Sequence, residues 1–218
     1  LAASGRRIFI HGAEGHTAGR IYTRDMAVQA GVPVCSNWEE VAAALHTQNI
    51  AYLPLACLNR RLADIIQMRS LLGLRSPVHS MARLLNPLNA PLVMQGIFHP
   101  PYAPLHQDTG ALLEYPTTLV IKGEGGEIER NPDAPCRLHL AVGGRKTIEE
   151  WPALSTQRHL RGEDLSGDHL ARVWSGETQD PYATQAIIGT LAVVLRGLDQ
   201  RSSPSDLHGE AERMWRER

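Results

Sequence analysis

Short apolar runs alternate with helically periodic stretches along most of the chain. Runs rich in β-branched residues are typical of buried strands, whereas apolar positions three and four residues apart predict helices. The predicted strands are residues 7–10, 32–34, 50–55, 92–99, 117–122 and 136–142. The predicted helices outside residues 59–87 are 24–30, 39–46, 102–113, 168–175 and 182–198. This order predicts an α/β fold with a mostly parallel central sheet flanked by helices.

Residues 59–86 interrupt this alternation with a predicted pair of helices, joined at residues 73–75. Pro77 is placed to open the second helix. The apolar stripe of the pair contains Leu62, Ile65, Ile66 and Leu72. Beside one acid, Asp64, the pair carries the arginines Arg60, Arg61, Arg69, Arg75 and Arg83. Guanidinium groups on rigid elements suit carboxylate or phosphate recognition, and the alternative interpretation is a solvated helix face.

Cap residues support the shorter predicted helices, and the end of the chain is predicted to be less regular. Thr23 is a suitable N-cap for helix 24–30, and Ser36 or Asn37 for helix 39–46. Residues 147–167 are polar and without a clear period. Residues 201–218 are expected to form a flexible tail.

Composition and charge narrow the classes of protein. The hydrophobic content is 43% and the charged content 21%, which is typical of a globular chain, and the net charge is −1. Residues 1–100 carry nine arginines and five acids, so a polyanion, if one binds, is expected to bind this part of the chain. No apolar run approaches the length of a membrane helix, so no membrane partner is expected. The three scattered cysteines predict neither a disulfide framework nor a zinc site, and the default location is the cytoplasm.

Three loops leave predicted strands at corresponding ends: His11-Gly12, His99-Pro100 and Lys122-Gly123. Ligands of open α/β sheets gather at the carboxyl ends of strands, so these loops define the expected site. None of them is a dinucleotide fingerprint or a P-loop. The alternative is that they are ordinary strand-end turns.

Four segments resemble anthranilate phosphoribosyltransferase, and they occur in the same order and at similar spacing as in that family. Residues 68–88, MRSLLGLRSPVHSMARLLNPL, are similar to that family's signature VRxxLGIRTxFNxLGPLxNP. IHG near the start resembles the family's KHG loop, residues 23–31 resemble its SADVLEALG helix start, and residues 120–127 resemble its VHGxDGLDE loop. The resemblance covers roughly residues 6 to 200, and it implies the fold of the nucleoside phosphorylase/phosphoribosyltransferase superfamily.

The resemblance also implies a domain organisation. Residues 1–58 and 87–200 would form the α/β domain, and residues 59–86 would belong to a small helical domain. The N-terminal helices and the glycine-rich diphosphate loop of the family have no counterpart here, so an N-terminal helical part is expected to be missing from this sequence. Family members form two-fold dimers through the helical part, which implies a homodimer.

By the same resemblance, part of the family's binding site is retained and part is lost. Arg69 stands where the family's arginine holds the anthranilate carboxylate, and the other retained positions are His11, Gly12, Thr23 and Asp25. Ile10 and Ala13 replace the lysine and asparagine that help hold phosphoribosyl pyrophosphate, and Glu14 replaces the next arginine. Glu127 can stand for the first acid of the family's magnesium pair, but Ile128 replaces the second. A magnesium ion is therefore expected only if transferase activity is retained.

Two functions follow from this mixture. The losses resemble the YbiB-type branch of the family, which keeps the fold, lacks the catalytic motifs and binds nucleic acid without sequence preference. In that case Arg60, Arg61, Arg75 and Arg83 would contact the phosphate backbone. The alternative is an active phosphoribosyltransferase or glycosyltransferase that uses phosphoribosyl pyrophosphate and an aromatic acid such as anthranilate. Whether the chain is an enzyme is left open by the residues.

Overall fold

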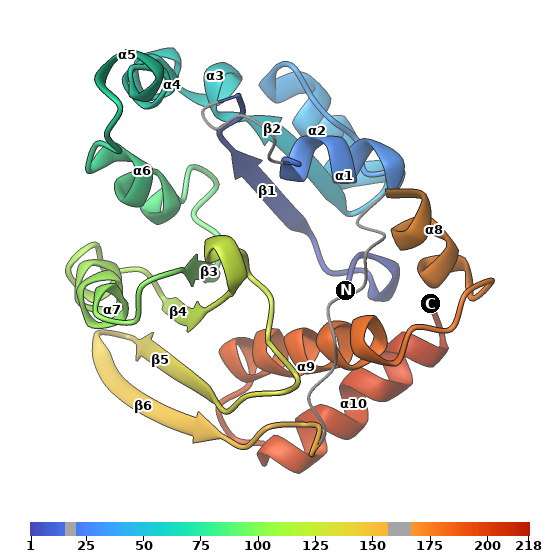
Figure 1. Ribbon diagram of the computed structural model, residues 1–218. Coiled ribbons are helices and arrows are strands. Elements are labelled where there is room, and N and C mark those ends of the chain that lie inside the picture. The colour runs from blue at the N-terminus through green and yellow to red at the C-terminus, as the bar shows by residue number, and fades with distance from the viewer. Residues whose placement is uncertain (16–20, 157–166) are drawn as a thin grey trace. The chain divides into compact units, whose positions relative to one another are not determined.

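The computed structural model describes residues 1–15, 21–156 and 167–218, which divide into two compact units (Figure 1). The described part of the first unit comprises residues 1–82 and 167–179. The second unit comprises residues 83–156 and 180–218 of the described chain. Residues 59–82 lie in the same unit as the first two strands.

The first unit is built on two parallel strands, β1 (Ile8–Gly12) and β2 (Ile50–Pro54), paired from Ile8 opposite Ile50 to Gly12 opposite Pro54. A short helix, η1 (Ala2–Ser4), precedes β1. Helices α1 (Thr23–Gln29) and α2 (Trp38–Thr47) lie between the two strands in the chain. Residues 32–34 contribute only a bridge from Val34 to Tyr52. The buried residues Cys35, Val41, Ala44, Ala51 and Leu53 form the core between α2 and β2.

The predicted helical pair is present as several short helices rather than two long ones. They are α3 (Leu55–Leu58), α4 (Arg60–Gln67), α5 (Arg69–Leu72), α6 (Val78–Met81) and η2 (Ala82–Leu84). The Asn59 side chain caps α4 by accepting a hydrogen bond from the Leu62 amide, 3.1 Å away. Gly73 ends α5 with a φ of 68°, a conformation that favours glycine. Helix α8 (Gly167–Ser175) packs against α1 in the same unit.

The second unit contains a four-stranded sheet in the order β3-β4-β5-β6. Its strands are β3 (Leu92–Ile97), β4 (Thr117–Lys122), β5 (Cys136–Val142) and β6 (Arg145–Trp151). β3 and β4 are parallel, as expected, and α7 (Tyr102–Leu112) connects them. β5 and β6 are antiparallel to their neighbours, so this sheet is mixed rather than mostly parallel. β6 also corrects the prediction of irregular structure from residue 147 onward.

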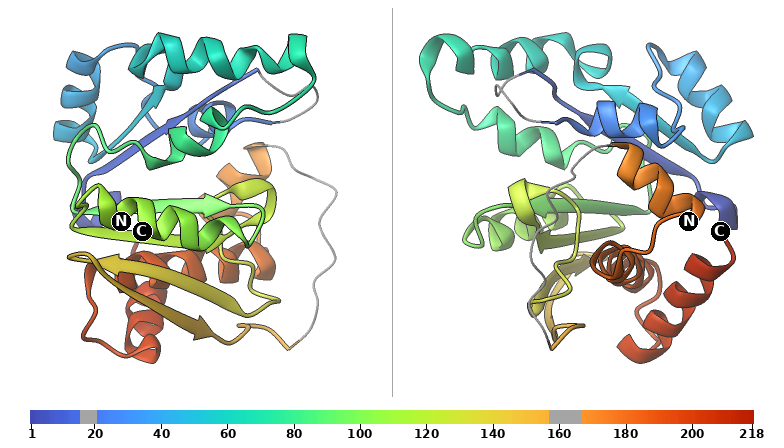
Figure 2. Two further views of the ribbon diagram at one scale, coloured as in Figure 1. Left: turned by 90° about the vertical axis from the view of Figure 1, so that its left-hand side faces the viewer. Right: turned by 45° about the vertical axis from the view of Figure 1, so that its right-hand side comes forward.

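Two C-terminal helices complete the second unit and lie side by side, as Figure 2 shows. α9 (Pro181–Leu198) packs against β3 and β4, and the Asp180 side chain caps it. α10 (Pro204–Arg216) packs along α9 and buries Leu207, Ala211 and Trp215. The expectation of a flexible tail at residues 201–218 is therefore wrong. A helix with three buried side chains gains enough apolar contact to be ordered.

Within the described residues, no helix is both long and apolar enough to cross a membrane.

Candidate functional site

A pocket of about 150 Å³ opens at the carboxyl ends of β1 and β2. Gly12 and Pro54, the last residues of the two strands, form part of its wall. The other lining residues are Ala13, Glu14, Leu55, Ala56, Ala63 and Gln67. The Gln67 side-chain amide donates a hydrogen bond of 2.5 Å to the Glu14 carbonyl and so ties the loop after β1 to α4. Ligands bind at this end of α/β sheets, so the pocket is a candidate site in the first unit.

Glu14 determines the charge of this pocket. The fully buried Tyr52 places its hydroxyl 3.3 Å from a Glu14 carboxylate oxygen and 3.4 Å from the Gly12 carbonyl oxygen. Burial, and then the charge of Glu14, raise the pKa of Tyr52 well above its ordinary value. Arg24 lies 3.8 Å from Glu14, too far for a strong ion pair at a partly exposed site. The loop that follows IHG therefore presents a carboxylate where an anion would need a donor.

Thr23 and Asp25 lie at the start of α1 and are exposed. Tyr22, not Thr23, is the N-cap, and Thr23 is the first helical residue. The Asp25 carboxylate accepts a hydrogen bond from the Tyr22 amide, with a distance of 3.4 Å. This helix-capping contact is a sufficient structural reason for an acid at position 25, so no ligand is needed to explain Asp25.

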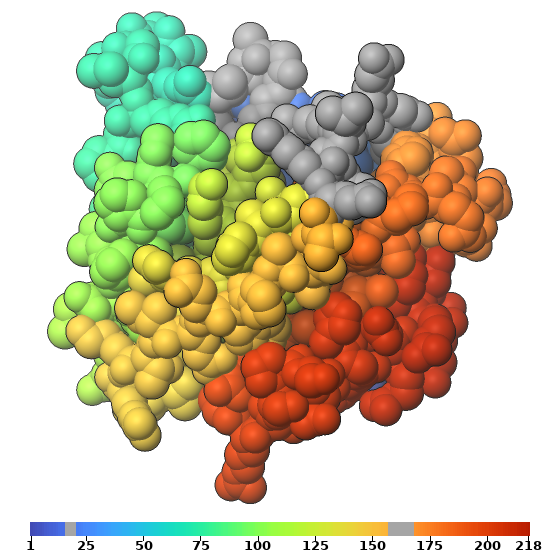
Figure 3. Space-filling model, turned by 60° about the horizontal axis from the view of Figure 1, so that its bottom comes forward, coloured from blue at the N-terminus to red at the C-terminus, as the bar shows by residue number. Residues whose placement is uncertain are grey.

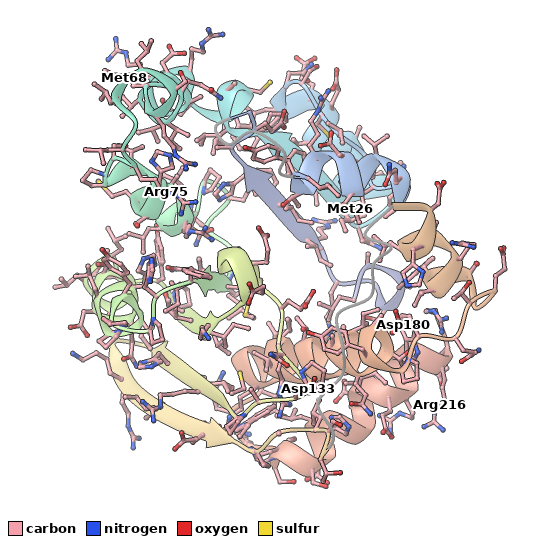
Figure 4. The ribbon with its side chains drawn as sticks, viewed as in Figure 1. Met26, Met68, Arg75, Asp133, Asp180 and Arg216 are labelled. Carbon is pink, nitrogen blue, oxygen red and sulfur yellow. The ribbon has the colours of Figure 1, made fainter. Side chains whose placement is uncertain are left out.

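The structure distributes the five predicted arginines over the two units. Arg60 pairs with Asp64 at 2.8 Å on the exposed face of α4. Arg61 is exposed on the same helix, and Arg69, the first residue of α5, is half-buried. Arg75 is exposed in the segment between α5 and α6, where Figure 4 labels it. Arg83 belongs to the second unit.

The acidic loop of the second unit follows β4 and contains η3 (Glu124–Gly126). One guanidinium nitrogen of Arg83 donates to the Gly96 carbonyl at 2.8 Å and to the Gly126 carbonyl at 2.5 Å. Ile128, at the position of the family's second acid, is 43% exposed and offers no ligand. In the part of the chain that the structure describes, no group of three or more His, Cys, Asp or Glu residues could hold a metal ion. These residues do not fit the magnesium site that the family resemblance implies.

Two of the residues that shape these sites, Tyr52 and Gln67, have no signal in the sequence. Tyr52 and Gln67 contact the Glu14 loop, but neither belongs to a motif. The sequence predicts that Arg83 belongs with the arginines of the helical pair, because it is close to them in the chain. The signal available for Arg83 was weak, since its partners are backbone carbonyl oxygens 13 and 43 residues away.

Comparisons with known proteins agree on one class of fold. No family model matches the chain. The anthranilate phosphoribosyltransferase of Saccharomyces cerevisiae superimposes with a TM-score of 0.69 and 17% identity, over 97% of this chain and 61% of that one. The same enzyme in complex with 4-fluoroanthranilate gives a TM-score of 0.68 and 16% identity, over 98% of this chain and 70% of that one. The chain thus has the anthranilate phosphoribosyltransferase fold.

Sequence relatives carry the same name. The anthranilate phosphoribosyltransferase of Ralstonia pickettii (strain 12J) is 26% identical over 125 residues, which are 57% of this chain and 36% of the relative. That of Synechococcus sp. (strain CC9311) is 22% identical over 201 residues, 88% of this chain and 58% of the relative. The chain thus spans less than two thirds of the length of these curated relatives. In sequence and in fold, the chain is similar to anthranilate phosphoribosyltransferases.

Proposed function

We propose that this chain is a non-catalytic phosphoribosyltransferase-like protein that binds the phosphate backbone of nucleic acid without sequence preference. The proposal that the chain is non-catalytic rests on one observation. Charge complementarity is lost at both loops that, by the family resemblance, would bind pyrophosphate and magnesium. Glu14 places a carboxylate beside the pocket at β1 and β2, and Tyr52 supports it there. At the loop after β4, Arg83 already bonds the Gly126 carbonyl. A pyrophosphate would meet repulsion at the first loop, and a metal would lack ligands at the second.

Exposed arginines in the first unit support backbone binding. Arg61 and Arg75 are both exposed, and the part of the chain that contains them is net basic. Guanidinium groups reach phosphate oxygens with paired donors and release counterions when they bind. The Arg60–Asp64 pair and the carbonyl contacts of Arg83 make these two residues weaker candidates than the sequence predicted. The proposed contact residues are therefore Arg61 and Arg75.

Binding of a labelled mixed-sequence DNA duplex tests this proposal, with fluorescence anisotropy measured at ~50 mM and ~200 mM salt. We expect affinity to fall at the higher salt concentration and to fall again in the double variant Arg61→Ala/Arg75→Ala. The salt slope of that variant should decrease by about one unit for each lost phosphate contact. Arg145→Ala, which removes an exposed arginine from β6, is the matched control. Salt-independent binding, or equal affinities of the double variant and the control, would contradict the proposal.

The pocket at β1 and β2 keeps a second function open, namely transfer of a phosphoribosyl group to an aromatic acid. Its walls still include Gly12, and the half-buried Arg69 lies one helix further along the chain. Incubation of the full-length protein with phosphoribosyl pyrophosphate, magnesium and anthranilate decides between the two functions. Saturable formation of phosphoribosyl anthranilate would replace the first proposal, whereas its absence under conditions in which a relative is active would support it.

We also propose that the protein forms a homodimer through the helices of the first unit and that it functions in the cytoplasm. Side chains with exposed fractions of 37 to 84% gather on α4, α5 and α6 and on the segments between them: Ile65, Met68, Leu71, Leu72, Leu74 and Met81. We call these residues the apolar surface of the first unit. Exposed apolar groups in such a number mark an interaction surface. The thiols of the three cysteines are free, which agrees with a reducing compartment.

A further inference from the structure

The loop at residues 123–127 is fixed to β3 by one side chain. Arg83 lies just before the sheet of the second unit, and its guanidinium nitrogen contacts the carbonyl oxygens of Gly96 on β3 and of Gly126 in the loop. The Gly123 amide adds a hydrogen bond of 2.9 Å to the Ile97 carbonyl. Arg83 therefore connects the loop to the strand through charge-assisted hydrogen bonds, which are about twice as strong as neutral ones.

Two glycines, Gly96 and Gly126, allow the loop to pack closely against β3 and Arg83. A side chain at Gly96 would collide with the backbone carbonyl groups of Gly126 and Glu127, so β3 and the loop touch directly. A side chain at Gly126 would lie 2.9 Å from an Arg83 nitrogen, and Gly126 also has a φ of 82°. Both glycines are thus required by the position of Arg83 and of the loop. The loop has little space in which to rearrange around a different cation.

Carbonyl oxygens and carboxylates are the ligands that hard divalent cations prefer. At this loop, two carbonyl oxygens are already satisfied by a permanently charged guanidinium group. Ile128 supplies no second carboxylate beside Glu127. A divalent ion at the Gly126 carbonyl would lie against the charge of Arg83, and like charges at that distance repel strongly.

We propose that Arg83 acts as an internal cation that holds the 123–127 loop in place without a divalent metal ion. The loop that the family resemblance assigns to magnesium is then a metal-independent structural element in this protein. Arg83 is a positioning residue for the loop and not a phosphate ligand. This inference does not depend on nucleic-acid binding, which is measured separately on Arg61 and Arg75.

Hydrogen exchange of the loop amides in the full-length protein tests the inference. In the wild-type protein, exchange at residues 123–127 should be the same in EDTA and in millimolar MgCl₂. In Arg83→Ala, exchange at these amides should accelerate by about tenfold or more, because two charge-assisted hydrogen bonds are lost. In Arg83→Lys, which keeps the charge but not the planar group, we expect an intermediate acceleration. Arg145→Ala, an exposed arginine of the same unit, should leave the loop unchanged.

Chemical rescue separates a specific cation from a general structural role. Millimolar guanidinium chloride should restore the slow exchange of the loop in Arg83→Ala, whereas sodium chloride at equal ionic strength should not. Slower loop exchange of the wild-type protein in MgCl₂, or broadening of the loop resonances by Mn²⁺ at low occupancy, would overturn the inference. Unchanged exchange in Arg83→Ala would also overturn it. If Arg83→Ala fails to fold, the wild-type comparison and Arg83→Lys still decide the question.

Discussion

Arginine side chains have different surroundings at different positions of this chain. Arg130 is 2% exposed, donates to the Pro152 carbonyl at 2.6 Å and stacks on Trp151, with its charge centre 5.3 Å from the ring. Burial lowers the pKa of Arg130 below its ordinary value. Arg61, in contrast, is exposed on α4. The surroundings of each guanidinium, rather than its residue type, therefore decide whether it is structural or available to a partner.

The buried residue His106 makes the stability of the folded chain depend on pH. It is 3% exposed, and its Nδ1 lies 2.6 Å from the Gln95 side-chain oxygen. Burial, followed by the charge of Arg83, lowers the pKa of His106 below 6.5. Burial and the charge of Arg137 lower the pKa of His139 in the same direction. Both imidazoles are thus neutral in the folded chain at neutral pH, but they take up protons near pH 6.5 once the chain unfolds.

We predict that thermal stability falls as the pH is lowered through about 6.5. Between the lowered folded pKa and the unfolded pKa, the unfolded chain binds more protons, so the free energy of unfolding decreases with decreasing pH. Melting temperatures measured between about pH 7.5 and pH 5.5 check this. His106→Gln should reduce the slope without abolishing it, because His139 contributes with the same sign. His46→Gln, on the exposed side of α2, should keep the wild-type slope.

At the scale of elements, α10 shows how a polar segment becomes part of the core. The Ser203 side chain accepts a hydrogen bond from the Asp206 amide at 3.2 Å, and the Ser203 hydroxyl donates to the Asp206 carboxylate at 2.7 Å. Leu207, Ala211 and Trp215 then recur every four residues and are all at most 8% exposed. Figure 3 shows the neighbouring part of this unit, where atoms of the β5–β6 hairpin (amber) adjoin those of the C-terminal helices (red). Arg196 of α9 joins the two regions through an ion pair with Glu149 of β6, at 2.6 Å.

We predict that Trp215→Ala lowers the free energy of unfolding by about 3 kcal/mol, because it leaves a cavity between α9 and α10. Chemical denaturation of the full-length protein, followed by circular dichroism, measures this change in the free energy of unfolding. Arg213→Ala lies on the exposed side of the same helix and should change the stability by less than about 0.5 kcal/mol. Equal effects of the two substitutions would mean that α10 does not pack as described.

At the scale of the whole molecule, apolar exposure is uneven. On the apolar surface of the first unit, Leu71 is 84% exposed and Leu74 is 75% exposed. Met68, labelled in Figure 4, belongs to the same surface and is 45% exposed. Covering several such side chains gains roughly 1.5–3 kcal/mol for each one that becomes fully buried. A second copy of the chain would supply that cover.

We predict that the wild-type protein is a dimer at micromolar concentration and that Leu71→Glu/Leu74→Glu raises the dissociation constant at least about 100-fold. The two carboxylates would be desolvated in the dimer, and two leucine contacts would be lost on each subunit. Light scattering coupled to size exclusion measures the mass in solution. Leu112→Glu replaces a leucine on α7 that is 82% exposed but lies outside the apolar surface, and it should leave the dimer intact. A monomeric wild-type protein would rule out this proposal.

Most of the elements could be predicted from the sequence, because their signals are local. The runs that became β1 to β5 are rich in apolar residues, and α2 and α9 have cap residues directly before their first turns. Two further elements, β6 and α10, also have local signals in the sequence, although neither was predicted as a helix or strand. Gly143 and Gly144, both with positive φ, mark the hairpin between β5 and β6. The Ser203–Asp206 capping box and the four-residue spacing of Leu207, Ala211 and Trp215 mark α10.

The sequence by itself determined the α/β class, the order of most elements and the likeness to anthranilate phosphoribosyltransferase. Only the tertiary structure decided which arginines are exposed and which are engaged. Arg75 and Arg83 are the same residue type and are close in the sequence. Arg83 nevertheless contacts Gly96 and Gly126, whereas Arg75 is exposed to solvent. Helical periodicity and caps depend on residues within one or two turns, so they can be predicted locally. The partners of a long, flexible arginine side chain depend on backbone groups that strand pairing brings together. Only the folded chain specifies those groups.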